Sequence, residues 1–169
     1  MCIRDSYIAI GANLSNPKDR LIGLPSVLER KGIHVTAASS LWRNPAWPEG
    51  MGYPDYLNGV LEVNFDGTAV ALLELLLKLE AEAGRERSER NAPRPLDLDI
   101  LDFRDEHHQS PDLILPHPRL HDRAFVLLPL AEIAPHWRHP KFGKSALELL
   151  AQLPLSSMGK MQFETSLSV

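Results

Sequence analysis

The sequence predicts an α+β fold of the ferredoxin-like sandwich class, in which helices pack against an antiparallel sheet. Short β-rich runs and helical segments alternate in the order β-α-β-β-α-β. The two middle β runs are joined by a loop without a helix, which favours antiparallel pairing. Further short apolar helical segments follow on the C-terminal side of this unit.

The first three elements each have a recognisable pattern. Residues 7–11 (YIAIG) are β-rich and end in glycine, which predicts a buried strand followed by a turn. Residues 17–31 place leucines at helical spacing and are followed by Gly32, a typical residue just after a helix. Residues 33–42 alternate and are rich in Val, Thr and Ser, which predicts a strand before the proline- and glycine-rich loop at 44–54.

The central part of the chain continues this alternation. Residues 56–65 (YLNGVLEVNF) predict the second strand of the antiparallel pair. A helix is predicted at 69–83, because this segment follows Thr68, a favourable N-cap, carries a dense leucine face and stops at Gly84. After an arginine-rich loop, residues 96–103 predict the last strand of the unit.

The remaining sequence predicts helices and loops within one domain. Residues 124–133 and 146–153 are short apolar helical patterns separated by turns rich in His and Pro. No repeat or linker divides the chain, so we expect a single domain at residues 7–155. Residues 1–6 do not continue into the pattern that follows, which suggests a non-native leader, and residues 156–169 are expected to form a tail.

Composition limits the possible classes of protein. The 169 residues are 44% hydrophobic and 24% charged, which is typical of one domain that buries a core. The formal net charge is −4, so no basic surface indicates nucleic acid. Cys2 is the only cysteine, which excludes a disulfide framework and favours the cytoplasm. The most apolar stretch, residues 69–79, is too short to cross a membrane, and we expect a monomer.

An acidic pair is the strongest candidate for chemistry. Asp97 and Asp99 lie two apart on the predicted strand 96–103, so both project from one face while the leucines between and beside them project from the other. Two carboxylates in this arrangement can hold one or two magnesium ions that share substrate phosphates. An isolated pair of this kind is about as often the solvated face of a sheet.

An arginine-rich loop leads directly into the acidic pair. Residues 84–94 contain four arginines, and the planar guanidinium group matches phosphate oxygens with two parallel hydrogen bonds. Alone, such a loop more often faces water. Beside paired carboxylates it indicates a polyphosphate site.

A third group combines aromatic rings with an amide. Trp47, Tyr56 and Phe125 could stack on a flat heterocycle, and Asn58 could meet a donor and an acceptor on its edge. Aromatic residues on strands more often belong to the core. His117 follows a proline and could contact phosphate or cap a helix, and the pattern does not choose between these roles.

Several familiar motifs are missing from the sequence. The chain has neither GxxxxGK[ST] nor GxGxxG, so a P-loop kinase and a dinucleotide-binding fold are not supported. It also lacks HExxH and a cysteine partner for its histidines, which argues against zinc. Any ATP must therefore be held in another way.

Five ordered segments carry a resemblance to a known family. They are YIAIGANL, SSLWRNP, PDYLNGV, LEAEAGRERSERNAPRPLDLDIL and LPHPRLHDRAFVLLPLAEIAP. In order and spacing they resemble the 6-hydroxymethyl-7,8-dihydropterin pyrophosphokinases of folate biosynthesis, and the resemblance runs from Tyr7 to about Leu150. It implies transfer of diphosphate from ATP to the hydroxymethyl group of the pterin, which gives AMP and the pterin diphosphate.

The resemblance also implies roles for individual residues. Asp97 and Asp99 match the ligands of two magnesium ions, and Arg85 and Arg94 match the catalytic arginines. The residues that match the pterin site are Pro45, Trp47, Tyr56, Asn58 and Phe125. The residues that match the ATP site are Glu80, Arg87, Arg94, Ile100, His117 and Arg123.

The chain departs from the family pattern at defined positions. Ala46 replaces a second proline of the pterin loop, and Trp47 replaces a smaller aliphatic residue. Leu77, Asp112 and Pro118 stand where other members have side chains that contact the nucleotide. Some ATP contacts should therefore differ, whereas the acidic pair and the two main arginines match.

Two other functions are compatible with the acidic pair. A nucleotidyltransferase also uses two spaced aspartates, but it needs a Gly-Ser turn shortly before them, and the nearest similar turn, residues 11–13, lies far upstream. A non-catalytic ferredoxin-like module would use the acids and arginines only as surface ion pairs, so their substitution would cost little.

Overall fold

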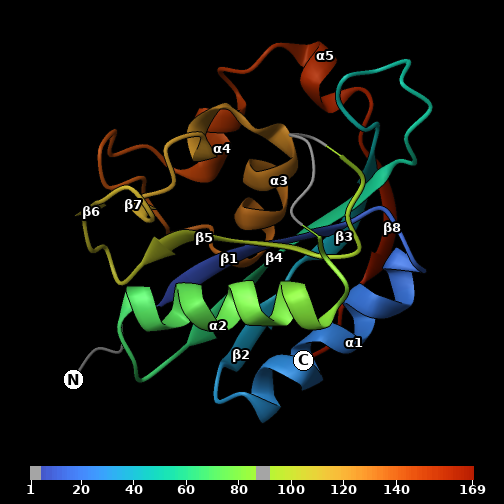
Figure 1. The fold of residues 1–169 in the computed structure, drawn as a ribbon. Helices are drawn as coiled ribbons and strands as arrows, with labels where there is room; N and C mark the ends of the chain where they lie inside the picture. The colour runs from blue at the N-terminus through green and yellow to red at the C-terminus, as the bar shows by residue number, and fades with distance from the viewer. Residues whose placement is uncertain (1–4, 87–91) are drawn as a thin grey trace.

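The fold is an antiparallel sheet covered by helices on both faces (Figure 1). We describe it from a computed structural model, which describes residues 5–86 and 92–169. The sheet order is β5-β1-β4-β3-β8, and β2 pairs with β4 beside β3. Its strands are β1 (Ser6–Ala12), β2 (His34–Ala38), β3 (Ser40–Asn44), β4 (Tyr56–Asn64), β5 (Asp97–Phe103) and β8 (Gln162–Ser166).

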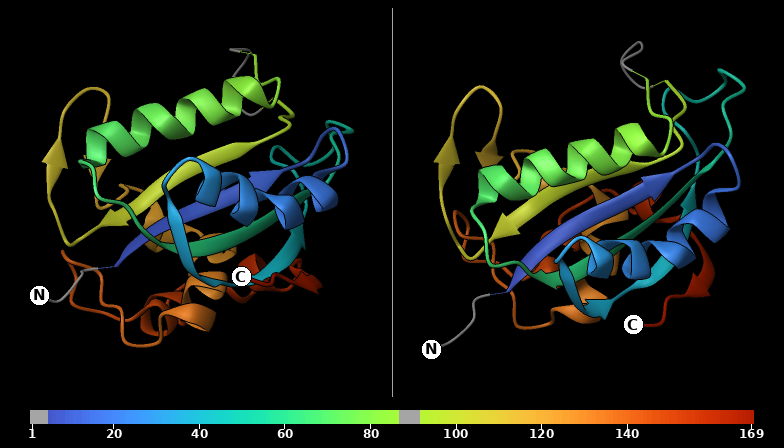
Figure 2. Two further views of the ribbon diagram at one scale, coloured as in Figure 1. Left: turned by 90° about the horizontal axis from the view of Figure 1, so that it is seen from below. Right: turned by 60° about the horizontal axis from the view of Figure 1, so that its bottom comes forward.

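The helices form a layer on each side of the sheet. Helices α1 (Pro17–Arg30) and α2 (Ala69–Glu82) lie on one face, and α3 (Ala124–Ile133) and α4 (Ala146–Leu150) lie on the other (Figures 1 and 2). Smaller elements connect these layers. They are β6 (His108–Gln109), β7 (Ile114–Leu115), the 3-10 turn η1 (Leu120–Asp122) and α5 (Leu155–Met158).

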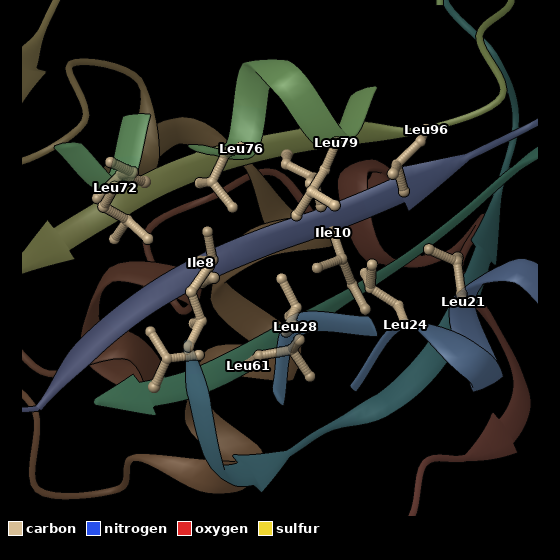
Figure 3. Packing of buried hydrophobic residues seen from close by; sticks show 14 of the residues in the cluster. Ile8, Ile10, Leu21, Leu24, Leu28, Leu61, Leu72, Leu76, Leu79 and Leu96 are labelled. Atoms are coloured by element: carbon tan, nitrogen blue, oxygen red, sulfur yellow. The ribbon is translucent and has the colours of Figure 1, made fainter. Parts of the chain in front are cut away.

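Alternation along the central strand separates two hydrophobic cores. Ile8 and Ile10 of β1 pack between the leucines of α1 and α2, as Figure 3 shows. Tyr7 projects to the opposite cluster, which is built on α3 and α4. This alternation is what a strand buried on both faces requires. The sheet is therefore held rigidly from both sides, and side chains at the ends of its strands can be positioned precisely.

The predicted helix at 69–83 is confirmed together with its cap. The Thr68 hydroxyl accepts a hydrogen bond from the Ala71 N–H at 3.1 Å, at the first turn of α2. Leu72, Leu76 and Leu79 are buried at the expected helical spacing. Helices α1 and α3 also match the predicted segments.

Two predicted boundaries were wrong. The single strand predicted at 33–42 is divided into β2 and β3 at Ser39. Ser39 is buried, and its hydroxyl accepts from the Val60 N–H at 2.9 Å and donates to the Ser40 carbonyl at 2.8 Å. The Ser39 N–H still donates to the Val60 carbonyl at 3.0 Å, but the Val60 N–H bonds the Ser39 hydroxyl instead of a main-chain carbonyl, and β2 and β3 pair with different parts of β4 on either side. The helix predicted at 146–153 ends at Leu150, ahead of turns that precede Pro154.

Part of the segment expected to be a tail belongs to the sheet. Strand β8 lies within residues 156–169 and pairs with β3. Glu164 on β8 forms ion pairs with Arg43 of β3 at 2.9 Å and with Lys18 of α1 at 3.3 Å. The boundaries of the domain at residues 7 and 155 stay predictions. Within the described part of the chain, no helix has the length and apolarity needed to span a bilayer.

Mildly acidic pH should weaken the layer around α3, because His139 is buried there. His139 is 3% exposed and packs against Trp137 and Phe142. Burial lowers the pKa of His139 from its ordinary value of 6.5 to about 4. The unfolded chain therefore binds more protons than the folded chain between these values, so this contribution to stability is complete above pH 6.5 and is lost as the pH falls through 4.

A ring substitution tests this linkage. His139→Phe keeps an aromatic ring without a titrating nitrogen. We expect the slope of the free energy of unfolding against pH to fall, at its steepest, by an amount that corresponds to about one bound proton. Urea unfolding across this pH range measures the slope. His136→Phe, at an exposed position, is the control and should leave the slope unchanged. An unchanged slope in His139→Phe would contradict the assignment.

Candidate active site

A pocket of about 330 Å³ lies where β1, β3, β4 and β5 meet α3, on the face of the sheet opposite α1 and α2. The arginine-rich loop and the loop that follows β3 complete its walls. Most of the residues that the sequence analysis selected are among its lining. These are Pro45, Trp47, Tyr56, Asn58, Arg85, Arg94, Asp97, Asp99, Arg123 and Phe125.

The acidic pair lies in this pocket because of strand alternation. Asp97 and Asp99 line the pocket, whereas Leu98 and Ile100 on the same strand belong to the core beneath α1 and α2. Partial loss of hydration raises the pKa of Asp99, and the charge of Asp97 raises it further. A cation between the two carboxylates would remove this repulsion.

Arginine side chains form ion pairs with both carboxylates of the acidic pair. Arg85 Nη1 and Arg94 Nη1 both contact Asp97 Oδ1, at 2.7 and 3.0 Å. On the far side, Arg123 Nη1 lies 3.9 Å from Asp99 Oδ2. Among the described residues, four arginines and two aspartates line the pocket, so its lining carries a positive charge that an anionic ligand would complement.

Glu80 lies behind Arg85 rather than in the pocket. Its buried carboxylate is 2.5 Å from Arg85 Nη1 and accepts from the Leu98 N–H at 2.6 Å. Burial raises the pKa of Glu80 to about 7, although both contacts favour the charged form. Glu80 thus connects α2 to β5 and to the arginine that reaches the acidic pair.

The donor set of the acidic pair suits magnesium. Mg²⁺ prefers oxygen ligands and is commonly held by one or two carboxylates, with water and substrate phosphates in the remaining positions. Asp97 and Asp99 supply two such carboxylates at the base of an open pocket. Within residues 5–86 and 92–169, no group of three or more His, Cys, Asp and Glu side chains is arranged to hold a metal. The two carboxylates are therefore a donor set that fits Mg²⁺.

The other half of the pocket is aromatic. Tyr56 and Phe125 line it, and the Tyr56 hydroxyl donates to the Ala92 carbonyl at 3.4 Å. The Arg123 guanidinium lies 5.7 Å from the centre of the Phe125 ring. Trp47 reaches the pocket from the loop after β3 and remains 68% exposed. A flat ligand would therefore meet aromatic surface beside the charged groups.

Two of the predicted ATP-binding residues lie in a neighbouring pocket. Ile100 and His117 line a cavity of about 250 Å³ that shares Asp99 with the first. His117 Nδ1 accepts from the Arg119 N–H at 3.1 Å, and burial lowers the pKa of His117 to about 4. Its other ring nitrogen therefore carries the proton and is a donor. The predicted residue Arg87 lies outside the described residues.

Sequence reasoning missed three polar residues of this region. Asn44 and Arg119 line the pocket. Asn13 is buried beside it, and its side chain donates to the Pro54 carbonyl at 3.0 Å and accepts from the Arg94 N–H at 2.8 Å. The position of Asn13 directly after a buried strand was the one available signal. Through these hydrogen bonds, Asn13 links the arginine-rich loop and the loop before β4 to the end of β1.

Comparison with known proteins identifies the family. The family model described as 7,8-dihydro-6-hydroxymethylpterin-pyrophosphokinase (HPPK) matches residues 7–135. The chain belongs to the HPPK family. Two relatives are 2-amino-4-hydroxy-6-hydroxymethyldihydropteridine pyrophosphokinases. The protein from Synechocystis sp. is 37% identical, and the match covers 90% of this chain and 78% of the relative. The protein from Pseudomonas aeruginosa is 36% identical, and the match covers 94% of this chain and 98% of the relative.

A solved structure agrees with the HPPK assignment at the level of the fold. Plasmodium falciparum HPPK-DHPS, crystallised with pterin and p-hydrobenzoate, superposes with a TM-score of 0.64 at 11% sequence identity. The match covers 94% of this chain and 47% of the other, so this chain spans about half the length of that protein. The mixed helix and antiparallel sheet architecture is thus shared with an HPPK structure.

Proposed function

We propose that this chain transfers diphosphate from ATP to the hydroxymethyl group of 6-hydroxymethyl-7,8-dihydropterin, a step of folate biosynthesis. The observation that carries this proposal is one pocket in which an acidic pair, surrounded by arginines, adjoins an aromatic wall with an amide. Membership of the HPPK family and the names of its relatives support the same activity.

The register of the sheet relates the two halves of the pocket. Asn58 on β4 lies opposite Gly11 on β1, and Gly11 lies opposite Asp97 on β5. Neighbouring strands are about 4.8 Å apart, so the amide and the acidic pair are separated by roughly 10 Å across the sheet. A two-ring heterocycle held at Asn58, between Tyr56 and Phe125, would extend its substituent toward the acidic pair.

The charged half of the pocket would hold the phosphates. Asp97 and Asp99 are the proposed ligands of two magnesium ions, which when bound would neutralise phosphate charge. Arg85 and Arg94 would exchange their contacts with Asp97 for contacts with phosphate oxygens, since a guanidinium group binds either partner. Arg123 faces the same space from the other side.

The nucleoside of ATP would occupy the neighbouring cavity. Ile100 supplies apolar surface there, and His117 supplies a neutral N–H donor. Glu80 would act through Arg85, which it contacts. Arg87 is proposed as a further ATP contact on the resemblance alone. Leu77, Asp112 and Pro118 stay the positions where nucleotide contacts should differ from those of other family members.

The reaction would depend on position and charge rather than on a strong base. The hydroxyl oxygen of the pterin forms a bond to the β-phosphorus of ATP and loses its proton to water. The bond from that phosphorus to the α–β bridging oxygen breaks, and AMP leaves with that oxygen. Arg85 and Arg94 would stabilise the charge that develops on the transferred phosphates. The aromatic wall would hold the acceptor in line for attack.

Three finer properties are part of the proposal. The core would be a ferredoxin-like sandwich, supported by the order β5-β1-β4 with β2 and β3 beside β4, and by α1 and α2 on one face. The charge and cysteine content support a cytoplasmic location, and we propose that the chain acts as a monomer without nucleic acid or membrane partners.

The identity of the products tests this function. Purified protein with ATP, Mg²⁺ and 6-hydroxymethyl-7,8-dihydropterin should form AMP and the pterin diphosphate in equal amounts, which chromatography can quantify. Omitting the pterin is the control and should leave ATP intact. ADP would indicate a simple kinase and free diphosphate a nucleotidyltransferase, while the absence of any product would favour a binding module.

A further inference from the structure

Two asparagines of the pocket contact each other across neighbouring strands. Asn44 on β3 lies opposite Tyr56, and Asn58 lies two residues further along β4 on the same face. This diagonal relationship brings the two amides within reach. Asn58 Nδ2 donates a hydrogen bond to Asn44 Oδ1.

The amide of Asn44 is itself oriented by the main chain. Asn44 Nδ2 donates to the Pro45 carbonyl at 3.3 Å, which leaves its Oδ1 to face Asn58. A rotation of the Asn44 amide by 180° would place two donors against Asn58 Nδ2 and an oxygen against the Pro45 carbonyl. The observed orientation is therefore the one that satisfies both neighbours.

The opposite side of Asn58 is set by a glycine. Gly11 faces Asn58 directly on β1, and a Cβ atom at Gly11 would lie 2.7 Å from Asn58 Oδ1. The missing side chain leaves the space that this oxygen occupies. Asn58 is thus held between β3 and β1, with its nitrogen toward Asn44 and its oxygen toward Gly11.

We propose that Asn44 is a positioning residue that fixes the orientation of the Asn58 amide and thereby the order of donor and acceptor groups that the pocket presents to its heterocyclic substrate. One N–H of Asn58 is used by Asn44, so the second N–H and Oδ1 remain for a ligand edge. The identity of that ligand as a pterin rests on the proposed function, whereas the orientation of the amide does not.

The chemical consequence is selectivity among heterocycles of similar shape. Asparagine presents a donor and an acceptor that differ only by rotation about one bond, and a freely rotating amide would accept either order on a ring edge. A fixed amide leaves an unpaired buried group when the order is wrong, which is how polar sites reject close analogues. Asn44 supplies this constraint without touching the reacting phosphates.

Two substitutions at position 44 distinguish the effect of the hydrogen bond to Asn58 from the effect of side-chain shape. Asn44→Leu keeps the approximate volume and removes both the acceptor for Asn58 Nδ2 and the donor to the Pro45 carbonyl. Asn44→Asp removes only that donor and keeps an acceptor for Asn58 Nδ2. Asn64→Leu is the matched control, since Asn64 lies at the other end of β4, away from the pocket-lining residues. Melting curves for all three variants show that binding is compared between folded proteins.

The first measurement needs no substrate. In the ligand-free protein, the side-chain NH₂ group of Asn58 should exchange its hydrogens faster with solvent in Asn44→Leu than in the unchanged chain, because a restraining hydrogen bond is lost. Nitrogen-edited NMR records this exchange. Asn44→Asp and Asn64→Leu should keep slow exchange. Equal exchange in Asn44→Leu and the unchanged chain would overturn the proposal.

The second measurement uses 6-hydroxymethyl-7,8-dihydropterin with a non-hydrolysable ATP analogue and Mg²⁺. Loss of one hydrogen bond predicts a rise in pterin Kd of about three- to tenfold in Asn44→Leu, and Asn44→Asp should stay within about threefold of the unchanged chain. The KM for ATP and kcat should change less than the KM for pterin. An Asn44→Asp variant as impaired as Asn44→Leu would overturn the proposal.

These measurements test the role of Asn44 separately from the proposed function. If the unchanged protein forms no AMP but Asn58 exchange responds to Asn44→Leu, the proposed function fails and the orientation of the amide holds. If the unchanged protein forms AMP and Asn44→Leu alters neither exchange nor pterin affinity, the role of Asn44 fails and the proposed function holds.

Discussion

Asp97→Asn should abolish AMP formation while leaving the fold largely intact. Asparagine keeps the size of the side chain but offers one neutral oxygen in place of a carboxylate, which weakens any magnesium site. Because metal and charge neutralisation supply most of the catalysis in phosphoryl transfer, we expect turnover to fall by at least about 10³-fold.

The expected cost in stability is much smaller. Asp97 is partly exposed and contacts Arg85 and Arg94 at the pocket, and ion pairs of this kind contribute on the order of 1 kcal/mol or less. Steady-state AMP formation over a series of Mg²⁺ concentrations, together with urea unfolding, measures both effects. The exposed Asp66, substituted by Asn, is the control and should change neither.

Two outcomes would contradict this account. Normal turnover in Asp97→Asn would exclude the carboxylate as a metal ligand. Loss of cooperative unfolding together with activity would assign Asp97 a structural role instead of a metal-binding one.

Arg94→Ala should reduce turnover much more than ATP affinity. Arg94 contacts Asp97 and stands beside the position proposed for the transferred phosphates, so its charge should matter most when negative charge develops there. We expect kcat to fall by about 10²- to 10³-fold and the Kd for the ATP analogue to rise by less than about tenfold.

The backbone position of this loop should survive the substitution. Asn13 binds the main-chain N–H of position 94, which alanine retains, so the loss can be attributed to the guanidinium group. Calorimetry with the ATP analogue and single-turnover kinetics separate affinity from chemistry. Arg30→Ala, at the exposed end of α1, is the control. Equal losses in kcat and affinity would instead indicate that Arg94 only binds ATP.

Local patterns in the sequence were sufficient for much of the fold and of the candidate site. Alternation on β5 correctly predicted that Asp97 and Asp99 share a face, because strand geometry alone determines it. The leucine spacing and Thr68 likewise defined α2, since caps and helical faces are local features. The aromatic residues could be placed in the pocket only through the family resemblance.

The features that were missed depend on contacts between distant parts of the chain. The division between β2 and β3 follows from the bonds of Ser39 to Val60, which no local pattern records. The role of Asn13 arises from contacts with Pro54 and Arg94, far along the sequence. Strand β8 has no buried face, so it lacks the alternation by which strands are recognised.

The pairing of β3 with β8 has a consequence for how the chain folds. Strand β3 carries Asn44 and leads into the loop with Pro45, yet its outer partner β8 is synthesised only after all the other strands of the sheet. Until residues 162–166 have left the ribosome, the outer edge of β3 has no partner strand and can template pairing with another chain. The covering of this edge of β3 therefore depends on a strand that lies far along the chain, rather than on the elements next to β3 in sequence.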